Sequence, residues 1–467
     1  MIETLPNKVN ASNNLKDLVE DQRNYFNSHS TLSTSFRLKQ LKKLKSLIQE
    51  NEDELHHAIH ADFGKSKFEN LVIELLPLYE ELDIAIKNLK QWTRKKRVRT
   101  NMLNFPAKSY LVQEPLGVSL IIGAWNLPYN LLLSPLIGSI AAGNTALLKP
   151  SELSPRTSAL MARIINTHFD KEYLHVVEGG IPTTTSLLEQ RFDKVFFTGS
   201  PAVGKIVNKA VAGNLTNITL ELGGKNPAIF TNNCSLKVSV KRMIWSKFVN
   251  SGQLCIAPDY ALVHKDIKKE FLACAVKEIK KSNFSSDNNN YVQMINDRHF
   301  DRVVKMIDPN KVYFGGQYDR NTRYIQPTIL DNVSMEDEIM QDEVFGPILP
   351  VIEYETIDQA FNIIKNYEKP LSAYLFSNNA LEKKRFLSEL RFGNGGINDS
   401  VMQISNANLP FGGVGQSGQG RYHGKYSFEC FSHFKSIIDK TPWIEPNIKY
   451  YGYNKLKLSM IKMLSKF

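Results

Sequence analysis

Short apolar runs that alternate with helix-like segments are the feature that most limits how this chain can fold. In YLVQEPLGVSLIIGAWN, at positions 110–126, a β-rich apolar run ends at a glycine and a polar turn. The next segment, LLLSPLIGSIAAGNTALLKPSE at 131–152, reads as a helix that leads into another short apolar run. Strand, helix and strand in this order are typical of a βαβ unit. The pattern therefore predicts an α/β protein built on a parallel sheet.

The same alternation continues over most of the chain. It passes through HVVEGG, DKVFFTGSPAVGKIVNKAV and ITLELGGKNPAIF, and a second α/β series follows from 235 to 400. From 12 to 100, apolar residues recur every three or four positions, which predicts a helical N-terminal stretch. A chain of 467 residues is too long for one ordinary core, so we expect two or three domains or one elaborated α/β unit. The polar run SSDNNN at 285–290 is expected to be a surface loop.

Cysteine usage and apolar run length bear on the compartment. The chain has four cysteines, none in a CxxC pair, and they are too few for a disulfide framework. This favours a reducing compartment and no metal centre. The N-terminal segment has no apolar run behind a basic region, and no apolar stretch reaches roughly 18 residues. We therefore expect a cytoplasmic protein that neither is secreted nor spans a membrane.

The formal net charge of +11 is compatible with binding to nucleic acid or to an anionic membrane surface. It is also compatible with a basic enzyme that binds neither. The basic residues are spread along the chain, as in QLKKLK, RKKRVR and KEIKKS. Aromatic residues are not interleaved with them, as they would be on a platform that stacks bases. Nucleic acid is therefore not an expected partner.

The segment KVFFTGSPAVGK has the features of a phosphate-binding turn. An apolar strand runs into Gly199 and Ser200, Pro201 suits the first helical position, and Gly204 follows one turn later. A helix that begins directly after a strand offers N–H groups and a positive dipole to a pyrophosphate. Because the full GxGxxG pattern is missing, this segment taken alone favours the alternative, a plain strand-to-helix turn with Ser200 as its cap.

LLKPSE places Lys149 and Glu152 at the end of a predicted parallel strand. Open α/β sheets bind ligands at this edge, and Lys149 can hydrogen-bond ribose hydroxyls there. The alternative is a strand end that is simply solvated.

Two further segments carry candidates for covalent chemistry. In NSGQLCIAPDY, Cys255 follows a glycine turn, and a thiolate is a strong nucleophile when its pKa is lowered locally. A buried and inert cysteine is the alternative. In ITLELGGKNP, Glu221 ends an apolar strand, so its carboxylate can project into a cleft, and burial should raise its pKa toward the range of a general base.

Six motifs, taken in order and spacing, resemble the aldehyde dehydrogenase superfamily. They are AWNLP at 124–128, LLKPSE at 147–152, FTGSPAVGK at 197–205, LELGGKNP at 220–227, GQLC at 252–255 and EVFGPILP at 343–350. The segment FGGVGQSGQGRYHGKYSFECFSH at 411–433 resembles the class 3 branch, which includes fatty and aromatic aldehyde dehydrogenases. The resemblance covers roughly residues 15–440.

This resemblance implies an α/β fold with a Rossmann-like NAD-binding domain, a catalytic domain and a small bridging element. It places the dinucleotide-binding domain at 1–99 and 114–222 and the catalytic domain at 223–405. The bridging element, at 100–113 and 406–440, would support a homodimer. Residues 441–467 would form a basic amphipathic C-terminal tail.

The resemblance also implies a role for each candidate residue. Cys255 would attack the aldehyde carbon, the Asn126 amide and the Cys255 N–H would hold the oxyanion, and Glu221 would activate water to hydrolyse the thioester. The cofactor would be NAD+ by preference, with NADP+ as an alternative. Its binding residues would be Lys149, Glu152, Gly199, Ser200, Gly204, Glu343 and Phe345.

Two departures from the family pattern bear on the substrate. Leu127 stands where the family more often has an aromatic residue, which favours a medium- or long-chain aliphatic or other apolar aldehyde. The C-terminal end lacks the long apolar anchor of some fatty aldehyde dehydrogenases. An alternative is a CoA-acylating relative, in which the thiol of CoA replaces water at the thioester. The presence of Glu221 argues against it, because a general base favours hydrolysis by water. A second alternative is a family member that acts as a binding protein and has lost catalysis. The presence of Cys255, Glu221, Asn126 and Lys149 argues against it.

The C-terminal segment is basic and has helical periodicity. No acidic residue follows Glu445, whereas five lysines do. Read as a helix from about Asn454, the segment groups its apolar residues on one stripe and places lysines beside it. The stripe consists of Leu456, Met460, Met463, Leu464 and Phe467, and the lysines are Lys455, Lys462 and Lys466. The stripe lies either on an anionic membrane at the inner face, as a peripheral contact, or back against the enzyme or a dimer partner.

Overall fold

A six-stranded sheet organises the first unit of the computed structural model, which describes residues 8–285 and 291–465. Its strand order is β17-β7-β6-β3-β4-β5, and every pairing is parallel except that of β17 with β7. The strands are β3 (Val118–Ile122), β4 (Thr145–Lys149), β5 (Leu174–Val176), β6 (Lys194–Gly199), β7 (Asn217–Leu222) and β17 (Gly418–Gln419). The predicted parallel α/β core is confirmed.

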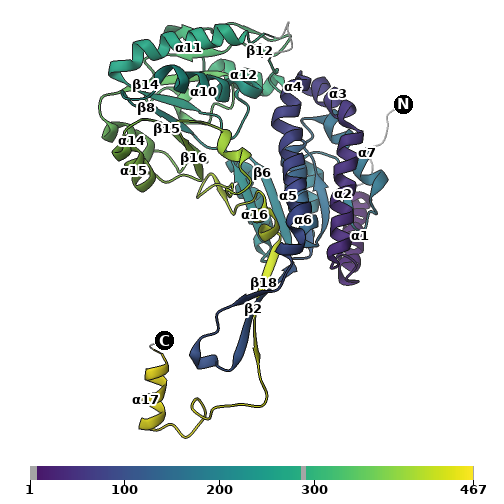
Figure 1. The fold of residues 1–467 in the computed structure, drawn as a ribbon. Coiled ribbons are helices and arrows are strands. Elements are labelled where there is room, and N and C mark those ends of the chain that lie inside the picture. Colours follow the sequence, from purple (N-terminus) through teal and green to yellow (C-terminus); the bar gives the residue numbers. More distant parts are fainter. Residues whose placement is uncertain (1–7, 286–290, 466–467) are drawn as a thin grey trace.

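Helices cover both faces of this sheet, and the helical N-terminal stretch is confirmed (Figure 1). They are α1 (Lys8–Asn27), α2 (Thr34–Glu50), α3 (Glu52–Phe63), α4 (Lys67–Asn70), a π-helical turn η1 (Leu71–Leu75), α5 (Leu76–Trp92), α6 (Asn130–Ala142), α7 (Pro155–His168), α8 (Ile181–Leu188) and α9 (Pro201–Ala212).

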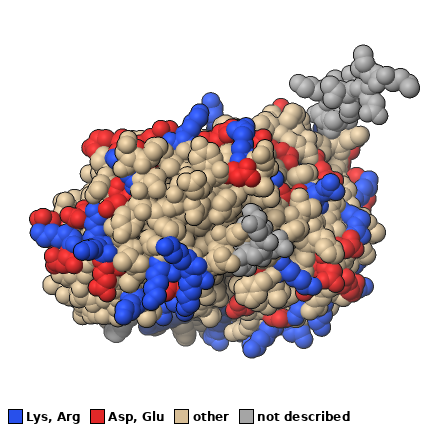
Figure 2. Space-filling model, turned by 90° about the horizontal axis from the view of Figure 1, so that it is seen from above, with Lys and Arg blue, Asp and Glu red and all other residues tan. Residues whose placement is uncertain are grey.

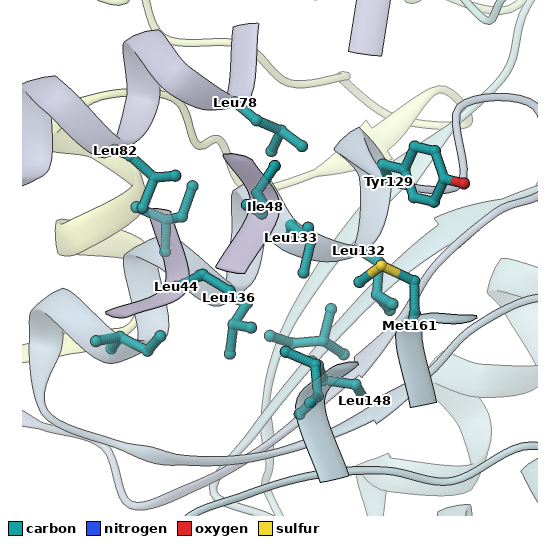
Figure 3. Close-up of a cluster of buried hydrophobic side chains, with 14 of the residues drawn as sticks. Leu44, Ile48, Leu78, Leu82, Tyr129, Leu132, Leu133, Leu136, Leu148 and Met161 are labelled. Carbon is teal, nitrogen blue, oxygen red and sulfur yellow. The ribbon is translucent and has the colours of Figure 1, made fainter. Parts of the chain in front are cut away.

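Helix α6 is the centre of this unit's core. All of its residues are buried, as expected for a helix that is apolar on every side. Figure 3 shows leucines of α6 between side chains of α2 and α5 on one side and Leu148 of β4 and Met161 of α7 on the other. The Tyr129 hydroxyl donates a hydrogen bond to the Leu55 carbonyl at 2.7 Å. The loop that precedes α6, which carries Asn126, is thereby fixed to the core.

A seven-stranded sheet organises the second unit. Its order is β10-β13-β14-β9-β8-β15-β16, and only β10 is antiparallel to its neighbour. The strands are β8 (Pro227–Phe230), β9 (Tyr260–His264), β10 (Val312–Phe314), β13 (Thr328–Leu330), β14 (Ile348–Tyr354), β15 (Ser372–Phe376) and β16 (Asn394–Ile397). The second predicted α/β series is therefore confirmed.

The helices and short elements of this unit flank its sheet. They are α10 (Leu236–Phe248), the 3-10 turn η3 (Val249–Gly252), η4 (Lys265–Ile267), α11 (Lys268–Ser282), α12 (Asp297–Lys305), η6 (Pro309–Lys311), the hairpin β11 (Tyr318–Asp319) and β12 (Tyr324–Ile325), α13 (Glu338–Gln341), α14 (Ile357–Lys365), α15 (Ala380–Glu389) and η7 (Met402–Ser405). Most of the predicted loop at 285–290 lies outside the described residues.

A three-stranded antiparallel arm extends away from both units (Figure 1). It consists of β1 (Lys96–Val98), β2 (Ala107–Pro115) and β18 (Ser432–Lys440), with the turn η2 (Met102–Asn104) at its far end and α16 (Lys425–Cys430) at its base. Strands β2 and β18 pair along their whole length, from Pro115 opposite Ser432 to Ala107 opposite Lys440. The arm thus joins two segments that are far apart in the sequence.

The last helix, α17 (Lys455–Leu464), lies beyond the arm and contacts η2 (Figure 1). Asn454 caps it by accepting a hydrogen bond from the Lys457 N–H at 2.9 Å, so the predicted helix start is confirmed. Its apolar side chains do not pack on the body of this chain, since Leu456 is 69% exposed and Met463 is 60% exposed. The last two residues of the predicted stripe and lysine group, Lys466 and Phe467, lie outside the described residues.

Surface charge is mixed on the face shown in Figure 2. Lysine and arginine side chains stand in separate groups there, among acidic side chains and a broad area that carries neither charge. In the described ranges, none of the helices combines the length and the apolar character needed to cross a bilayer.

Candidate active site

Cys255 follows a tight turn at the end of α10. Asn250, Ser251 and Gly252 have φ values of 55°, 53° and 71°, in the left-handed region. Non-glycine residues adopt this conformation at a cost, and such residues cluster at active sites. Beyond the cysteine, Asn226 donates hydrogen bonds to the Cys255 carbonyl at 2.8 Å and to the Ala257 carbonyl at 3.0 Å. The nucleophile candidate is therefore held on both sides by a rigid loop.

Asn126 reaches the same loop from the first unit. Its side-chain Nδ2 donates a hydrogen bond to the Gln253 carbonyl, two residues before Cys255, at 3.0 Å. The residue is buried, with 3% exposure. An amide held in this way is preorganised, which is what an oxyanion donor requires.

Glu221 lies near the end of β7, opposite Thr198 of β6 and Gly418 of β17. It is 3% exposed, and neither of its carboxylate oxygens has a hydrogen-bond partner within the described residues. Burial, and then the nearby Cys430 thiol, raise the pKa of Glu221 well above its ordinary value. A carboxyl with a raised pKa is a stronger base near neutral pH, as predicted from the sequence.

The Cys255 thiol is close enough to two carboxylates to be affected by their charges. Burial first, then Glu343 and Glu221, raise the pKa of Cys255 to about 12, whereas the N–H groups of Cys255 and Ile256 lower it. The thiol is therefore protonated at neutral pH in this arrangement, and its reaction requires a base to take the proton.

Glu343 and Phe345 also border the cysteine side of the site. The Glu343 carboxylate lies directly against Gly223, where a Cβ would overlap it, so glycine lets the carboxylate take this position. Burial and the charge of Asp259 raise the pKa of Glu343 to about 8. The Phe345 ring lies edge-on to Trp125, with ring centroids 5.6 Å apart. Phe345 and Glu343 thus stand between the two units, next to the residues around Asn126 and Cys255.

The turn at 199–204, for which phosphate binding was predicted, has the predicted local structure. Ser200 caps α9 by accepting a hydrogen bond from the Val203 N–H at 3.4 Å, directly after Gly199 ends β6. A Cβ at Gly204 would lie 2.6 Å from the Leu222 side chain, so glycine lets the helix pack closely on β7. A close helix N-terminus at the carboxyl end of a parallel sheet fits a dinucleotide phosphate.

Lys149 is buried at the end of β4, so the interpretation as a solvated strand end is wrong. Its Nζ donates to the Pro150 carbonyl at 2.6 Å and lies 3.5 Å from Glu152 Oε2. Burial lowers the pKa of Lys149, and Glu152 opposes that shift. The Glu152 side chain remains 43% exposed, which leaves its carboxylate open to a ligand. Among the described residues, no hydrogen bond joins Lys149 to Glu343.

Several residues that shape the site were not predicted from the sequence. Asn226, Asn250 and Gln253 stand inside the quoted motifs, so their polar character was the available signal. The ring centroids of His299 and Trp125 are 5.4 Å apart. The Arg302 guanidinium donates a hydrogen bond to the Glu343 carbonyl at 3.1 Å. Both look like surface charges of an amphipathic helix in the sequence. No described group of His, Cys, Asp or Glu side chains is arranged to hold a metal ion.

Comparison with known proteins places this site in a family. The model described as "Aldehyde dehydrogenase family" matches residues 7–437. The chain is 44% identical to the 4,4'-diaponeurosporen-aldehyde dehydrogenase of Staphylococcus aureus, over 96% of this chain and 98% of that protein. It is 43% identical to a rat protein named "Aldehyde dehydrogenase, dimeric NADP-preferring", over 91% of this chain and 95% of that one. Relatives named as family 3 members, at 38% to 42% identity, confirm the class 3-like branch.

A solved structure confirms the fold. The structure titled "Substrate bound state of Staphylococcus Aureus AldH" superimposes with a TM-score of 0.94 at 43% identity, and covers 96% of this chain and 99% of its own. The Rossmann-like sheet with its flanking α/β unit and arm is therefore an aldehyde dehydrogenase fold. The chain belongs to the aldehyde dehydrogenase family and is an NAD(P)-dependent enzyme that oxidises an aldehyde to the carboxylic acid.

Proposed function

We propose that the enzyme oxidises a medium- or long-chain aliphatic, or other apolar, aldehyde through a thioester on Cys255. The Cys255 thiol gives its proton to a water molecule, and its sulfur attacks the aldehyde carbon, which gives a thiohemiacetal oxyanion. The Asn126 amide and the Cys255 N–H hold the oxyanion. The nicotinamide of the cofactor accepts the hydride when it is bound. Glu221 then takes a proton from water, which attacks the thioester, and the acid and the free thiol are released.

Residues at the carboxyl end of the first sheet fit the parts of a dinucleotide cofactor, which supports the proposed cofactor site. The N-terminus of α9, with Gly199, Ser200 and Gly204, would hold the pyrophosphate. Lys149 and Glu152, at the end of β4, would contact a ribose. Glu343 and Phe345, on the cysteine side, would hold the nicotinamide end beside Cys255. In this proposal the first unit is the dinucleotide-binding domain at 1–99 and 114–222, and residues 223–405 form the catalytic domain.

An apolar hollow between η1 and the end of α10, the helix that precedes the Cys255 loop, is the observation that carries the substrate assignment. It has a volume of about 220 Å³ and is lined mainly by apolar side chains, namely Phe68, Val72, Ile73, Trp245, Val249 and Phe284, together with Ser66 and Glu69. Val249 and Ile73 also belong to a buried apolar cluster with Leu127, Leu131 and Leu254. Leu254 precedes Cys255, so a packed apolar cluster connects the wall of the hollow to the loop of the reactive residue.

A chain-length series tests this assignment. With hexanal, decanal, hexadecanal and benzaldehyde, we expect kcat/KM to rise with aliphatic length by up to about fourfold per buried methylene, because each contributes about 0.8 kcal/mol. Adding CoA should leave the rate and the free-acid product unchanged, which separates hydrolysis from acyl transfer. A flat series, or a preference for small polar aldehydes, would contradict the apolar substrate.

We further propose a preference for NAD+. The exposed Glu152 carboxylate can accept a hydrogen bond from a ribose 2′-hydroxyl, and its charge would repel a 2′-phosphate. The rat relative is named as NADP-preferring, so membership of the family does not set the cofactor preference. The proposal therefore concerns the Glu152 side chain itself. Glu152→Gln is expected to raise the NADP+ to NAD+ ratio of kcat/KM by about tenfold, which corresponds to about 1.4 kcal/mol of removed repulsion.

The matched control for Glu152 is Glu189→Gln. Glu189 is an exposed carboxylate that follows α8, so it tests the general effect of losing one surface charge. The control should leave the cofactor ratio at the parental value. An unchanged ratio in Glu152→Gln would show that this carboxylate does not face the adenosine ribose.

We infer that the bridging element at 100–113 and 406–440, which contains most of β2 and all of β18, supports a homodimer. We also infer that the tail at 441–467 binds an anionic membrane surface. The rat relative is named as dimeric. Ile437 and Ile438 of β18 are exposed on the arm, and α17 exposes Leu456, Leu458 and Met463 next to its lysines. Exposed apolar residues beside lysines suit the interface of an anionic bilayer, where each lysine contributes about 1 kcal/mol.

Vesicle co-sedimentation tests the tail. The full chain should sediment with anionic vesicles, and a version truncated after Pro446 should remain in solution. Lys455→Gln with Lys462→Gln, which keeps the apolar residues of α17, should bind more weakly and lose its salt dependence in part. Light scattering beforehand checks that all versions are dimers. Equal sedimentation of the full and truncated chains would remove the tail from membrane binding.

A further inference from the structure

A fully buried ion pair lies behind the loop that carries Asn126. Lys65 Nζ is 3.2 Å from Glu74 Oε1, and both side chains have no exposed surface. Glu74 stands in the π-helical turn η1, and such turns are frequent at functional sites. Replacing a buried ion pair with apolar residues is often neutral or stabilising, so stability alone does not account for this pair. Its hydrogen bonds point to another role.

The pair holds the Asn126 loop at two points. Lys65 Nζ donates a hydrogen bond to the Asn126 backbone carbonyl at 3.2 Å. Glu74 Oε2 accepts one from the Asn130 N–H at 2.9 Å, where α6 begins. The two ends of the loop are therefore tied to the same pair of opposite charges.

Asn250 extends this network to the nucleophile loop. Its Nδ2 donates to the Asn126 carbonyl at 3.1 Å and to the Gln253 carbonyl at 3.0 Å. The Asn126 side chain donates to that same Gln253 carbonyl. The left-handed Asn250 is held in turn by Glu69, which accepts its backbone N–H at 2.7 Å. Burial raises the pKa of both Glu69 and Glu74, and the Lys65 charge opposes each shift.

We propose that Lys65, paired with Glu74, is a positioning residue that fixes the Asn126 amide in the geometry that stabilises the oxyanion. This rests on the role proposed above for Asn126. Without the ammonium, the Asn126 carbonyl keeps the Asn250 amide as its one donor among the described residues, and the loop loses one of its two ties. A misplacement of about 1 Å at a reacting centre can cost about a hundredfold in rate.

A double-mutant cycle separates positioning from general stability. Lys65→Met with Glu74→Gln removes both charges together, keeps similar volumes and leaves an oxygen to accept the Asn130 N–H. It should lower kcat/KM for decanal by about tenfold or more, with the dissociation constant for NAD+ and the melting temperature near the parental values. In an Asn126→Ala background, the same pair of changes should lower kcat/KM by less than about twofold, because the group it positions is gone.

Two further variants complete the design. Arg37→Met removes another buried cation, one that donates to the carbonyls of Thr31 and Ala141 away from the site, and its effect should be fully additive with Asn126→Ala. If the Met and Gln pair does not fold, Lys65→Gln with Glu74→Gln goes through the same cycle, since glutamine is one bond shorter than lysine and cannot span both partners. The same non-additivity is expected.

The outcomes distinguish this inference from the proposed mechanism. A large loss in Asn126→Ala together with an additive loss in the Lys65 pair would overturn the positioning role and leave the oxyanion assignment standing. Parental activity in Asn126→Ala would overturn the oxyanion assignment itself and the positioning role with it. Non-additivity with unchanged NAD+ binding supports both.

Discussion

Replacing Cys255 with alanine is expected to lower steady-state aldehyde oxidation by more than about a hundredfold, because no other group can form the covalent intermediate. The change removes one atom from a loop held by Asn226 and by the turn at Asn250, so the fold and NAD+ binding should remain. Steady-state NADH production and a binding titration of NAD+ measure the two properties.

Cys274→Ala is the matched control for this experiment. Cys274 lies in α11 and packs against the core of the second unit, away from Glu221 and Asn126. It should retain parental activity. Turnover in Cys255→Ala above about a hundredth of the parental value would refute the assignment of the nucleophile.

Glu221→Gln is expected to separate the two halves of the reaction. Hydride transfer precedes the step assigned to Glu221, so the first turnover should release NADH in a burst about equal to the enzyme concentration, followed by a much slower steady rate. The Glu221 charge also raises the pKa of the Cys255 thiol, so its removal should not hinder thiolate formation. Stopped-flow absorbance resolves the two phases.

The parent enzyme, mixed under the same conditions, is the reference for the size of the burst. If both the burst and the steady rate are lost in Glu221→Gln, the carboxylate acts before hydride transfer, for example by taking the Cys255 proton. That result would move Glu221 to an earlier step of the mechanism.

Features set by local patterns could be predicted from the sequence. The parallel sheet follows from alternating apolar runs, and the cap of α9 follows from Ser200 before Pro201. The helix that begins after Asn454 follows from its periodicity. The raised pKa of Glu221 follows because an apolar strand ends there and leaves the carboxylate buried. Each of these depends on residues that are neighbours in the sequence.

Features set by contacts between distant segments could not be predicted. Lys65 and Glu74 look like ordinary surface charges in the sequence, and they are buried by contacts with the Asn126 loop and the start of α6, which are distant in the chain. The same holds for Lys149, whose burial depends on the whole sheet. The arm pairs β2 with β18 across more than half the chain, and no local pattern specifies that partner. Asparagine tolerates the left-handed conformation better than most residues, but that tolerance alone does not specify it at Asn250.

The central claim is that the aldehyde becomes a thioester on Cys255 before water releases the acid. The most direct test is the mass of the Cys255 peptide from Glu221→Gln enzyme that is mixed with NAD+ and decanal and quenched in acid. We expect a decanoyl group on Cys255, with the mass of decanal less two hydrogens, and no such group when NAD+ is omitted. An unmodified Cys255 peptide after NADH has formed, or the acyl group on another cysteine, would contradict it.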